Sequence, residues 1–462
     1  MKNLLSILIL TLIISCTTTN NKSTIYFGGE IINPKSKYVV LLKDNNVIDT
    51  LTLNNQNRYI EKFKSLKEGL YTFKHGNEFQ YIYLEPGDSI LIRLNTWDFD
   101  KSLVFTGKGS SKNEFLINLF LQNLKEEKAM YKYLKLNEAE FQTKIDSLAN
   151  ERISIYNEFA TAEESVSEGF NQLTNSAIHF PLYRLKEMYP YYYKKMNKLT
   201  KYPKVSDSFY NYRNHINLNE ENLVSFYPFQ NYVVSYLYNL SDDLKEKDPS
   251  KNNTTINILN SIIENIHLEE FKNTLLKRFV VQDFFESDVH CSINEDVLNI
   301  FNKNCGNIEY KKQIENLVFD SKKVTIHQPL TNFEVVSYND DVTKINTIIN
   351  QKNSVLYFWS TEYMSPVYLL KRIEYLENKF PNILFLGIKI NTNIDHLSSD
   401  PYLKKLDINK QYKLTPKSKA HQFLTSNYPR MMIVNKNGVV ENGFINFNAR
   451  NLHSELEKLE KN

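Results

Sequence analysis

The stretch SVLYFWSTEYMSP, residues 354–366, decides the fold of the C-terminal part of the chain. It joins an apolar, aromatic run, typical of a buried strand, to a short polar turn. A helical pattern follows to Phe380, and Leu369, Ile373, Leu376 and Phe380 stand at i, i+4, i+7 and i+11 on one apolar stripe. The stretch therefore predicts a strand, a turn and an amphipathic helix in that order.

The segments on either side extend this pattern. Residues 383–390 are almost continuously apolar, which predicts a buried parallel strand. Residues 341–351 and 420–425 are predicted helices, with an insert rich in Asp, Lys and Ser before the second. Residues 428–434 predict a strand, Asn437-Gly438 a type I′ turn into a second strand, and Leu452, Leu456 and Leu459 a closing helix. The order predicts an α/β domain over residues 322–462.

Taken together, these residues resemble the membrane-tethered thioredoxin-like thiol reductases of the TlpA and ResA type. The features that match are YFWST at 357–361, Tyr428-Pro429, and VNKNG at 434–438. The resemblance implies a thioredoxin-like fold, with Pro429 at the place where the family keeps a cis-proline.

The family's thiol chemistry is missing. Tyr363 holds the position of the attacking cysteine, Pro366 that of the resolving cysteine, Glu362 that of a tryptophan and Leu369 that of a glutamate. Disulfide exchange needs a thiolate, because it passes through a mixed disulfide. Tyrosine, with a reference pKa of about 10, cannot replace it. The site is predicted to be redox-inactive and to contain no catalytic residue.

Binding of a protein or peptide partner is the role that remains for this site. In thioredoxin-like folds the loop before the proline offers backbone hydrogen bonds to an extended peptide. We expect an aromatic and flexible binding surface there. Its predicted members are Trp359, Tyr363, Met364, Tyr428 and Pro429. The alternative is that these side chains only close a dead site.

The first sixteen residues read as a signal peptide. Lys2 is followed by a largely apolar run at 4–14, too short to span a bilayer, and by IISC at 13–16, which resembles a bacterial lipobox. We expect lipidation at Cys16, a polar tether at 17–23, and a body held at the inner or outer membrane that faces the periplasm or the cell surface. An ordinary secretory signal with an incidental cysteine is the alternative.

Cys291 and Cys305 remain after Cys16. They could form a disulfide outside the cytoplasm, or stay as two buried thiols. A thiol-disulfide oxidoreductase that uses them is the alternative function. The nine histidines lack zinc-site spacing and no phosphate loop is present, so no metal and no cofactor is expected. Net charge is only +3, which makes nucleic acid an unexpected partner.

The rest of the chain predicts two further domains, so the expected fold class is multidomain α+β. Residues 24–110 carry short aromatic and β-branched runs separated by turns, as in a β-sandwich. LEPGDSI at 84–90, FTGKG at 105–109 and Asn113 resemble the small β-sandwich that precedes thioredoxin-like domains in lipoproteins of Bacteroidetes type.

Residues 111–321 have a helical period and predict an all-helical middle domain. Prolines at 181, 190, 203, 228 and 249 are expected to break it into pieces. A tyrosine-rich cluster with neighbouring lysines and arginine could stack on a sugar, a base or a peptide, or could simply pack a helix. Its tyrosines are Tyr183, Tyr189, Tyr191, Tyr192 and Tyr193. In a third interpretation, the sandwich or this helical domain is the working part and the C-terminal domain a spacer.

Overall fold

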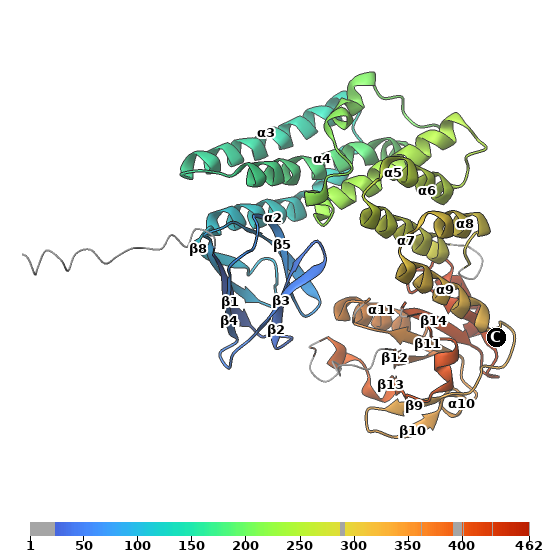
Figure 1. The fold of residues 1–462 in the computed structure, drawn as a ribbon. Helices are drawn as coiled ribbons and strands as arrows, with labels where there is room; N and C mark the ends of the chain where they lie inside the picture. The colour runs from blue at the N-terminus through green and yellow to red at the C-terminus, as the bar shows by residue number, and fades with distance from the viewer. Residues whose placement is uncertain are drawn as a thin grey trace, which may run out of the picture. The chain divides into compact units, whose positions relative to one another are not determined.

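The computed structural model describes residues 24–286, 292–361, 363–390, 400, 402–426 and 428–461. Two four-stranded sheets, a run of helices and a seven-stranded sheet follow one another along the chain (Figure 1). The fold class is multidomain α+β, as predicted. The chain divides into two compact units, residues 1–236 and 237–462, and the division falls inside α5 (Tyr227–Lys247). The predicted domain bounds stay a prediction.

The first unit opens with a β-sandwich. One sheet has the order β4 (Arg58–Phe63), β1 (Ile25–Ile32), β7 (Ser89–Asn95), β8 (Val104–Lys108). The other has the order β3 (Asn46–Thr52), β2 (Tyr38–Lys43), β5 (Gly69–His75), β6 (Glu78–Leu84). Every second residue of β7 is buried, because successive side chains of a strand point to opposite faces. Before β7, the amide of Asp88 donates to the carbonyl of Glu85 at 3.0 Å, and Gly87 supplies the positive φ of 94° that this turn needs.

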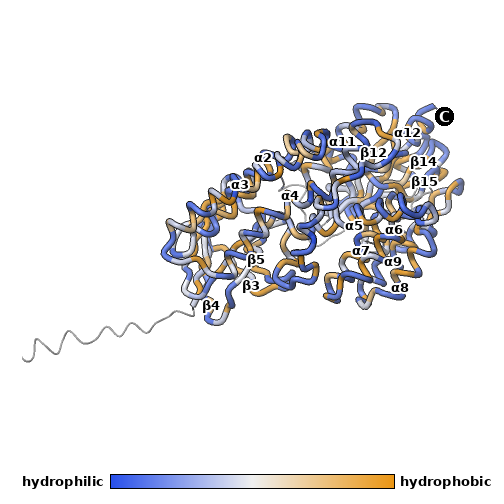
Figure 2. The backbone as a smooth tube through the Cα atoms, turned by 90° about the horizontal axis from the view of Figure 1, so that it is seen from above, coloured by the Kyte–Doolittle hydropathy of each residue, from blue (hydrophilic) through white to orange (hydrophobic). Residues whose placement is uncertain are grey.

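Helices occupy the middle of the chain, and hydrophobic and hydrophilic segments alternate along them (Figure 2). The first unit contains α2 (Ser110–Tyr133), α3 (Glu138–Ala162), α4 (Glu168–Met196) and the 3₁₀ turns η1 (Asp207–His215) and η2 (Glu221–Leu223). The second contains α6 (Thr254–Asn265), α7 (Glu269–Glu286), α8 (Glu295–Asn304) and α9 (Ile308–Lys323). Several begin at a side chain that accepts a backbone N–H, as Asn137 and Ser167 do for α3 and α4. Within the described part of the chain, no helix is long and apolar enough to cross a membrane.

Two of the five prolines do not break a helix, so that prediction is wrong for them. Pro181 and Pro190 lie inside α4. A proline in a helix interior removes one backbone hydrogen bond and costs about 3 kcal/mol. The flanking Phe180, Leu182 and Tyr189 are buried, and the burial of a large apolar side chain contributes about 1.5–3 kcal/mol each. Tertiary packing therefore outweighs the local penalty.

The seven-stranded sheet of the second unit has the order β10, β9, β13, β12, β11, β14, β15. Its strands are β9 (Glu334–Ser337), β10 (Val342–Lys344), β11 (Ser354–Trp359), β12 (Leu384–Lys389), β13 (Gln411–Leu414), β14 (Arg430–Val434) and β15 (Val440–Ile445). Its helical elements are α10 (Ile345–Ile348), α11 (Pro366–Lys379), α12 (Leu452–Lys461), η3 (Leu403–Lys405), η4 (Ile408–Lys410) and η5 (Lys419–Gln422). Strand β11 pairs in parallel with β12 and antiparallel with β14, which places it at the centre.

Strand β11 contributes to a core on each face of the sheet. Val355, Tyr357 and Trp359 pack with α11 and α12, whereas Leu356 and Phe358 pack with α10 and η5. All six residues of the strand are buried. Burial on both faces explains why the strand reads as a continuous apolar run rather than an alternating one.

Three local predictions in this domain need correction. Residues 341–351, expected to be one helix, form the edge strand β10 and then the short α10. The predicted helix at 420–425 is the shorter 3₁₀ turn η5. The insert contains a strand, β13, which was not predicted because the insert is rich in charged residues. The two end residues of β13 are buried and the two middle ones half-buried, which fits a strand paired with β9 and β12. Pairing with neighbouring strands, which the local sequence does not reveal, determines β10 and β13.

Candidate functional site

The turn after β11 is held by backbone hydrogen bonds. The carbonyl of Ser360 accepts from the amides of Tyr363 and Met364, at 3.3 and 3.1 Å. Ser365 then caps α11, because its side-chain oxygen accepts from the amide of Tyr368 at 3.2 Å. Pro366 is the first residue of the helix, where a missing N–H costs nothing. Pro366, which the resemblance aligns with the family's second cysteine, is thus a residue suited to starting the helix.

Tyr363 and Tyr428 meet at the surface, so the structure brings together two of the predicted binding residues. Their ring centroids lie 5.8 Å apart at an interplanar angle of 46°. Tyr363 is 50% exposed, whereas Met364, Tyr428 and Pro429 are half-buried. Burial, with a smaller contribution from Tyr363, raises the pKa of Tyr428 to about 12. The phenol of Tyr428 is therefore neutral near pH 7 and is not a nucleophile.

Trp359 does not belong to this surface. It is 1% exposed and lies in the core under α11. Its position at the end of a strand that is buried on both faces explains why. Leu369, in the position of the family's glutamate, is also buried in that core. Glu362 lies outside the described residues.

The peptide bond between Tyr428 and Pro429 is trans, as is every peptide bond in the described ranges. The cis bond that the resemblance implied is therefore absent here. The trans form of an X-Pro bond is favoured by about 0.5–1 kcal/mol unless its surroundings select the other. In this form the ring of Tyr428 packs against Phe285 of α7, with centroids 5.9 Å apart.

A buried ion pair fixes the loop that precedes Pro429. Arg430 Nη2 donates to Asp320 Oδ2 at 2.9 Å, and both side chains are shielded from solvent. Asp320, on α9, also accepts from the backbone amides of Thr425 and Ser426, at 2.9 and 2.7 Å. Arg430 Nη2 donates in addition to the carbonyl of Phe423 at 2.8 Å. Two backbone amides of the loop therefore donate to the carboxylate of Asp320 within the protein.

Sequence reasoning missed Asp320 and Arg430. A signal was present: Arg430 opens a strand whose other four residues are apolar, and all five are buried. A buried charge needs a partner, so the arginine alone called for an acid nearby. Nothing local pointed to Asp320, which lies 110 residues earlier in the chain.

The cysteine predictions rest largely on residues that the structure does not describe. Residues 1–23, which include Cys16, and Cys291 lie outside the described ranges. Cys305 is buried as a free thiol, and its Sγ lies 3.8 Å from the carbonyl oxygen of Asn307. Burial raises the pKa of this thiol, which lowers its thiolate fraction and its reactivity. In the described ranges, no group of three or more His, Cys, Asp or Glu side chains could hold a metal ion.

A central strand leads through a capped turn into α11, with an antiparallel hairpin beside it and α12 on the same face as α11. The fold is thioredoxin-like. Strand order and helix placement carry this assignment.

Comparisons with known proteins give the following likenesses. No family model matches the sequence, and no curated protein matches it. A thioredoxin-like protein from Bacteroides caccae has 13% identity and a TM-score of 0.28, over 56% of this chain and 96% of that one. A thiol:disulfide interchange protein from a Bacteroides species has 14% identity and a TM-score of 0.24, over 30% and 92%. An exposed lipoprotein thioredoxin from Streptococcus pneumoniae has 16% identity and a TM-score of 0.22, over 28% and 100%.

Proposed function

We propose that the second unit carries a redox-inactive thioredoxin-like domain that binds a segment of a partner protein, in an envelope lipoprotein of the TlpA and ResA type. The observation that carries the proposal is the half-exposed ring of Tyr363, set against Tyr428 where the family would keep its attacking thiol. A phenol cannot form a mixed disulfide, so contact replaces exchange at this position.

Side chains, rather than strand addition, make the contact in this proposal. The amides of Thr425 and Ser426 already donate to Asp320, so they are not offered to an extended peptide. The surface consists of Tyr363, Met364, Tyr428 and Pro429, and Trp359 lies beneath it in the core. Exposed aromatic residues are frequent anchors of protein interfaces, where truncation to alanine often costs about 2 kcal/mol or more.

Site-specific crosslinking tests the binding role. A photoreactive phenylalanine analogue is placed at Tyr363 in the full chain, expressed in its native envelope, and crosslinked proteins are identified by mass spectrometry. The matched control carries the analogue at Tyr375 of α11, which is 45% exposed. We expect a discrete partner at position 363 that is absent at position 375 and is reduced by Tyr428→Ala. Equal products at both positions, or none at 363, would contradict the proposal.

An insulin-reduction assay tests redox inactivity separately. The full chain is expected to reduce insulin no faster than buffer containing the same reductant. A Cys291→Ser, Cys305→Ser variant is the control. Turnover that disappears in this variant would establish the alternative, an oxidoreductase that uses other cysteines.

Envelope anchoring through Cys16 has its own readout. Labelling with a radioactive fatty acid should mark the chain, and the label should be lost in Cys16→Ala. We expect the wild-type chain to sediment with membranes and to require detergent for release. An unlabelled chain that is secreted freely would instead support an ordinary secretory signal.

A further inference from the structure

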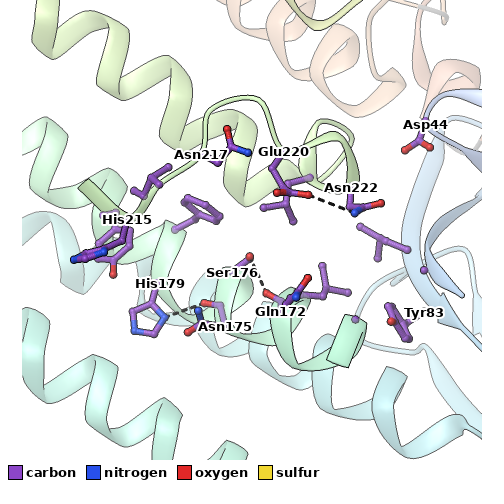
Figure 3. Close-up of a pocket in the computed structure, with 18 of the residues that line it drawn as sticks. Asp44, Tyr83, Gln172, Asn175, Ser176, His179, His215, Asn217, Glu220 and Asn222 are labelled. Atoms are coloured by element: carbon purple, nitrogen blue, oxygen red, sulfur yellow. Dashed lines mark hydrogen bonds between the residues drawn. The ribbon is translucent and has the colours of Figure 1, made fainter. Parts of the chain in front are cut away.

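A separate pocket lies within the first unit. Its volume is about 660 Å³, and its walls come from the β2–β3 turn, the start of β5, α4 and the segment that joins η1 to η2 (Figure 3). Small-molecule sites in proteins typically have volumes of about 300–1,000 Å³. The pocket is therefore large enough for a ligand of one or two sugar rings.

One wall is a polar stripe on α4. Four residues at i, i+3, i+4 and i+7 share one helix face and line the pocket: Gln172, Asn175, Ser176 and His179. Across the pocket, Asn217, Glu220 and Asn222 face this stripe (Figure 3). Amides, a hydroxyl and an imidazole on facing walls can both donate to and accept from one ligand.

The hydrogen bonds within the protein leave much of this capacity unused. The side-chain amide of Asn175 makes no hydrogen bond to any described residue. The Oδ1 of Asn217 accepts from the amide of Asn219 at 3.0 Å, which leaves its NH₂ group to donate. His179 Nδ1 lies 2.9 Å from the carbonyl oxygen of Asn175, so Nδ1 carries a proton and donates to that oxygen.

An aromatic wall completes the pocket. Tyr183 and Tyr212, which both line it, stack with centroids 4.3 Å apart and planes at 17°. The ring of His179 lies 5.5 Å from that of Tyr183. These flat, rigid rings give the pocket apolar surface beside the polar stripe. A pyranose ring has the matching character, because it carries an apolar C–H face and hydroxyl groups around its edge.

The charges around the pocket disfavour anions. Its lining includes the carboxylates of Asp44, Glu68 and Glu220 and the single ammonium group of Lys43. The Nζ of Lys43 makes a cation–π contact with the ring of Tyr71, 4.7 Å from its centroid. Phosphate and carboxylate ligands would thus meet more negative than positive charge. We propose that this pocket binds a short neutral saccharide, through the amides of α4 and of the 217–222 segment and through apolar contact with the rings of Tyr183 and Tyr212.

Saturation-transfer NMR tests the proposal on the full chain, purified in a detergent without a sugar headgroup. The probes are cellobiose, maltotriose and N,N′-diacetylchitobiose, with a lysine-rich hexapeptide and glucose 6-phosphate as the cationic and anionic comparisons. We expect at least one neutral saccharide to bind with millimolar affinity or better. Asn175→Ala and Asn217→Ala should each weaken that binding about 3- to 10-fold, as loss of a hydrogen bond does.

Asn150→Ala is the matched control, because Asn150 is an exposed asparagine of α3 that does not line the pocket. It should leave saccharide binding unchanged. Three results would overturn the proposal: no saturation transfer from any neutral saccharide at about 10 mM, which places Kd above the millimolar range; binding that both pocket variants leave intact; or binding of the hexapeptide or the sugar phosphate alone. None of these outcomes bears on the role proposed for Tyr363, which lies in the other unit.

Discussion

Arg430 and Asp320 form a buried ion pair, with Nη2 and Oδ2 2.9 Å apart, that joins the first residue of β14 to α9. Asp320 is completely buried, and it also accepts four hydrogen bonds from the backbone amides and hydroxyls of Thr425 and Ser426. One carboxylate therefore holds Thr425, Ser426 and Arg430 together.

Removing that carboxylate should destabilise the second unit strongly. Asp320→Ala removes the carboxylate that balances the charge of the buried Arg430, and breaking such an ion pair costs about 3–5 kcal/mol. The free energy of unfolding can be measured by urea titration of Trp359 fluorescence. A Trp97→Phe background removes the only other tryptophan, which is highly exposed. Glu455→Ala, which breaks the more exposed pair with Lys458, should cost less than about 1 kcal/mol. Equal losses would show that Asp320 does not hold the loop.

Truncation of two aromatic residues four positions apart should lower the free energy of unfolding by very different amounts. Trp359→Ala removes a fully buried ring and should cost about 3–5 kcal/mol of unfolding free energy. Tyr363→Ala removes a half-exposed ring and should change it by less than about 1 kcal/mol. Circular dichroism during urea unfolding gives both values without depending on the tryptophan signal. A large loss in Tyr363→Ala would mean that Tyr363 supports the fold rather than a partner.

The stability of the β-sandwich should fall as the pH drops below about 6.5, the reference pKa of histidine. His75 is buried; its Nδ1 donates to the carbonyl of Tyr38 at 3.0 Å and its Nε2 accepts from the amide of Lys35 at 2.9 Å. Burial lowers the pKa of this imidazole. The unfolded chain therefore takes up a proton at a higher pH than the folded chain does, so acid favours unfolding from about pH 6.5 down to the lowered folded pKa.

An NMR titration of the histidine ring protons checks this pH dependence. The signal of His75, assigned by its loss in His75→Gln, should titrate below 6.5. The same variant should also be less sensitive to a change from pH 7 to pH 5. A titration midpoint above 6.5 would contradict the buried, neutral assignment.

Cys305 should react slowly with alkylating reagents in the folded chain. Its thiol is buried and its pKa is raised, and both effects reduce the supply of accessible thiolate. Iodoacetamide labelling at pH 8, mapped by mass spectrometry at Cys305, should be at least about 10-fold faster in urea than in buffer. Equal rates would show that the thiol is reachable, and would revive its candidacy for redox chemistry.

The sequence alone was sufficient to predict an element of the fold where the pattern was local and strong. The continuous apolar run at β11 and the stripe on α11 predicted the thioredoxin-like frame, and alternation predicted the sandwich. The missing thiols were visible directly. Prediction failed where distant parts of the chain decide the outcome, as for Pro181 and Pro190 inside α4 and for the strand β13 within a polar insert.

The candidate sites show the same limit. Tyr363 and Tyr428 were predicted to meet, because the family resemblance fixed their places. Trp359 was predicted to belong to the binding surface. This was wrong, because β11 is buried on both faces and the side chain of Trp359 lies in the core. The stripe of Gln172, Asn175, Ser176 and His179 was not predicted, although its residues have helical spacing in the sequence. Its partners in the 217–222 segment were not predicted either, because no periodicity links a loop to a helix.

Pro366 has a consequence for how long any bound segment stays. Position 366 has an imino ring at the start of α11 and position 363 a phenol, so neither can form a mixed disulfide with a bound segment. If the proposed binding role holds, we expect the lifetime of that complex to depend on dissociation and not on the concentration of reductant.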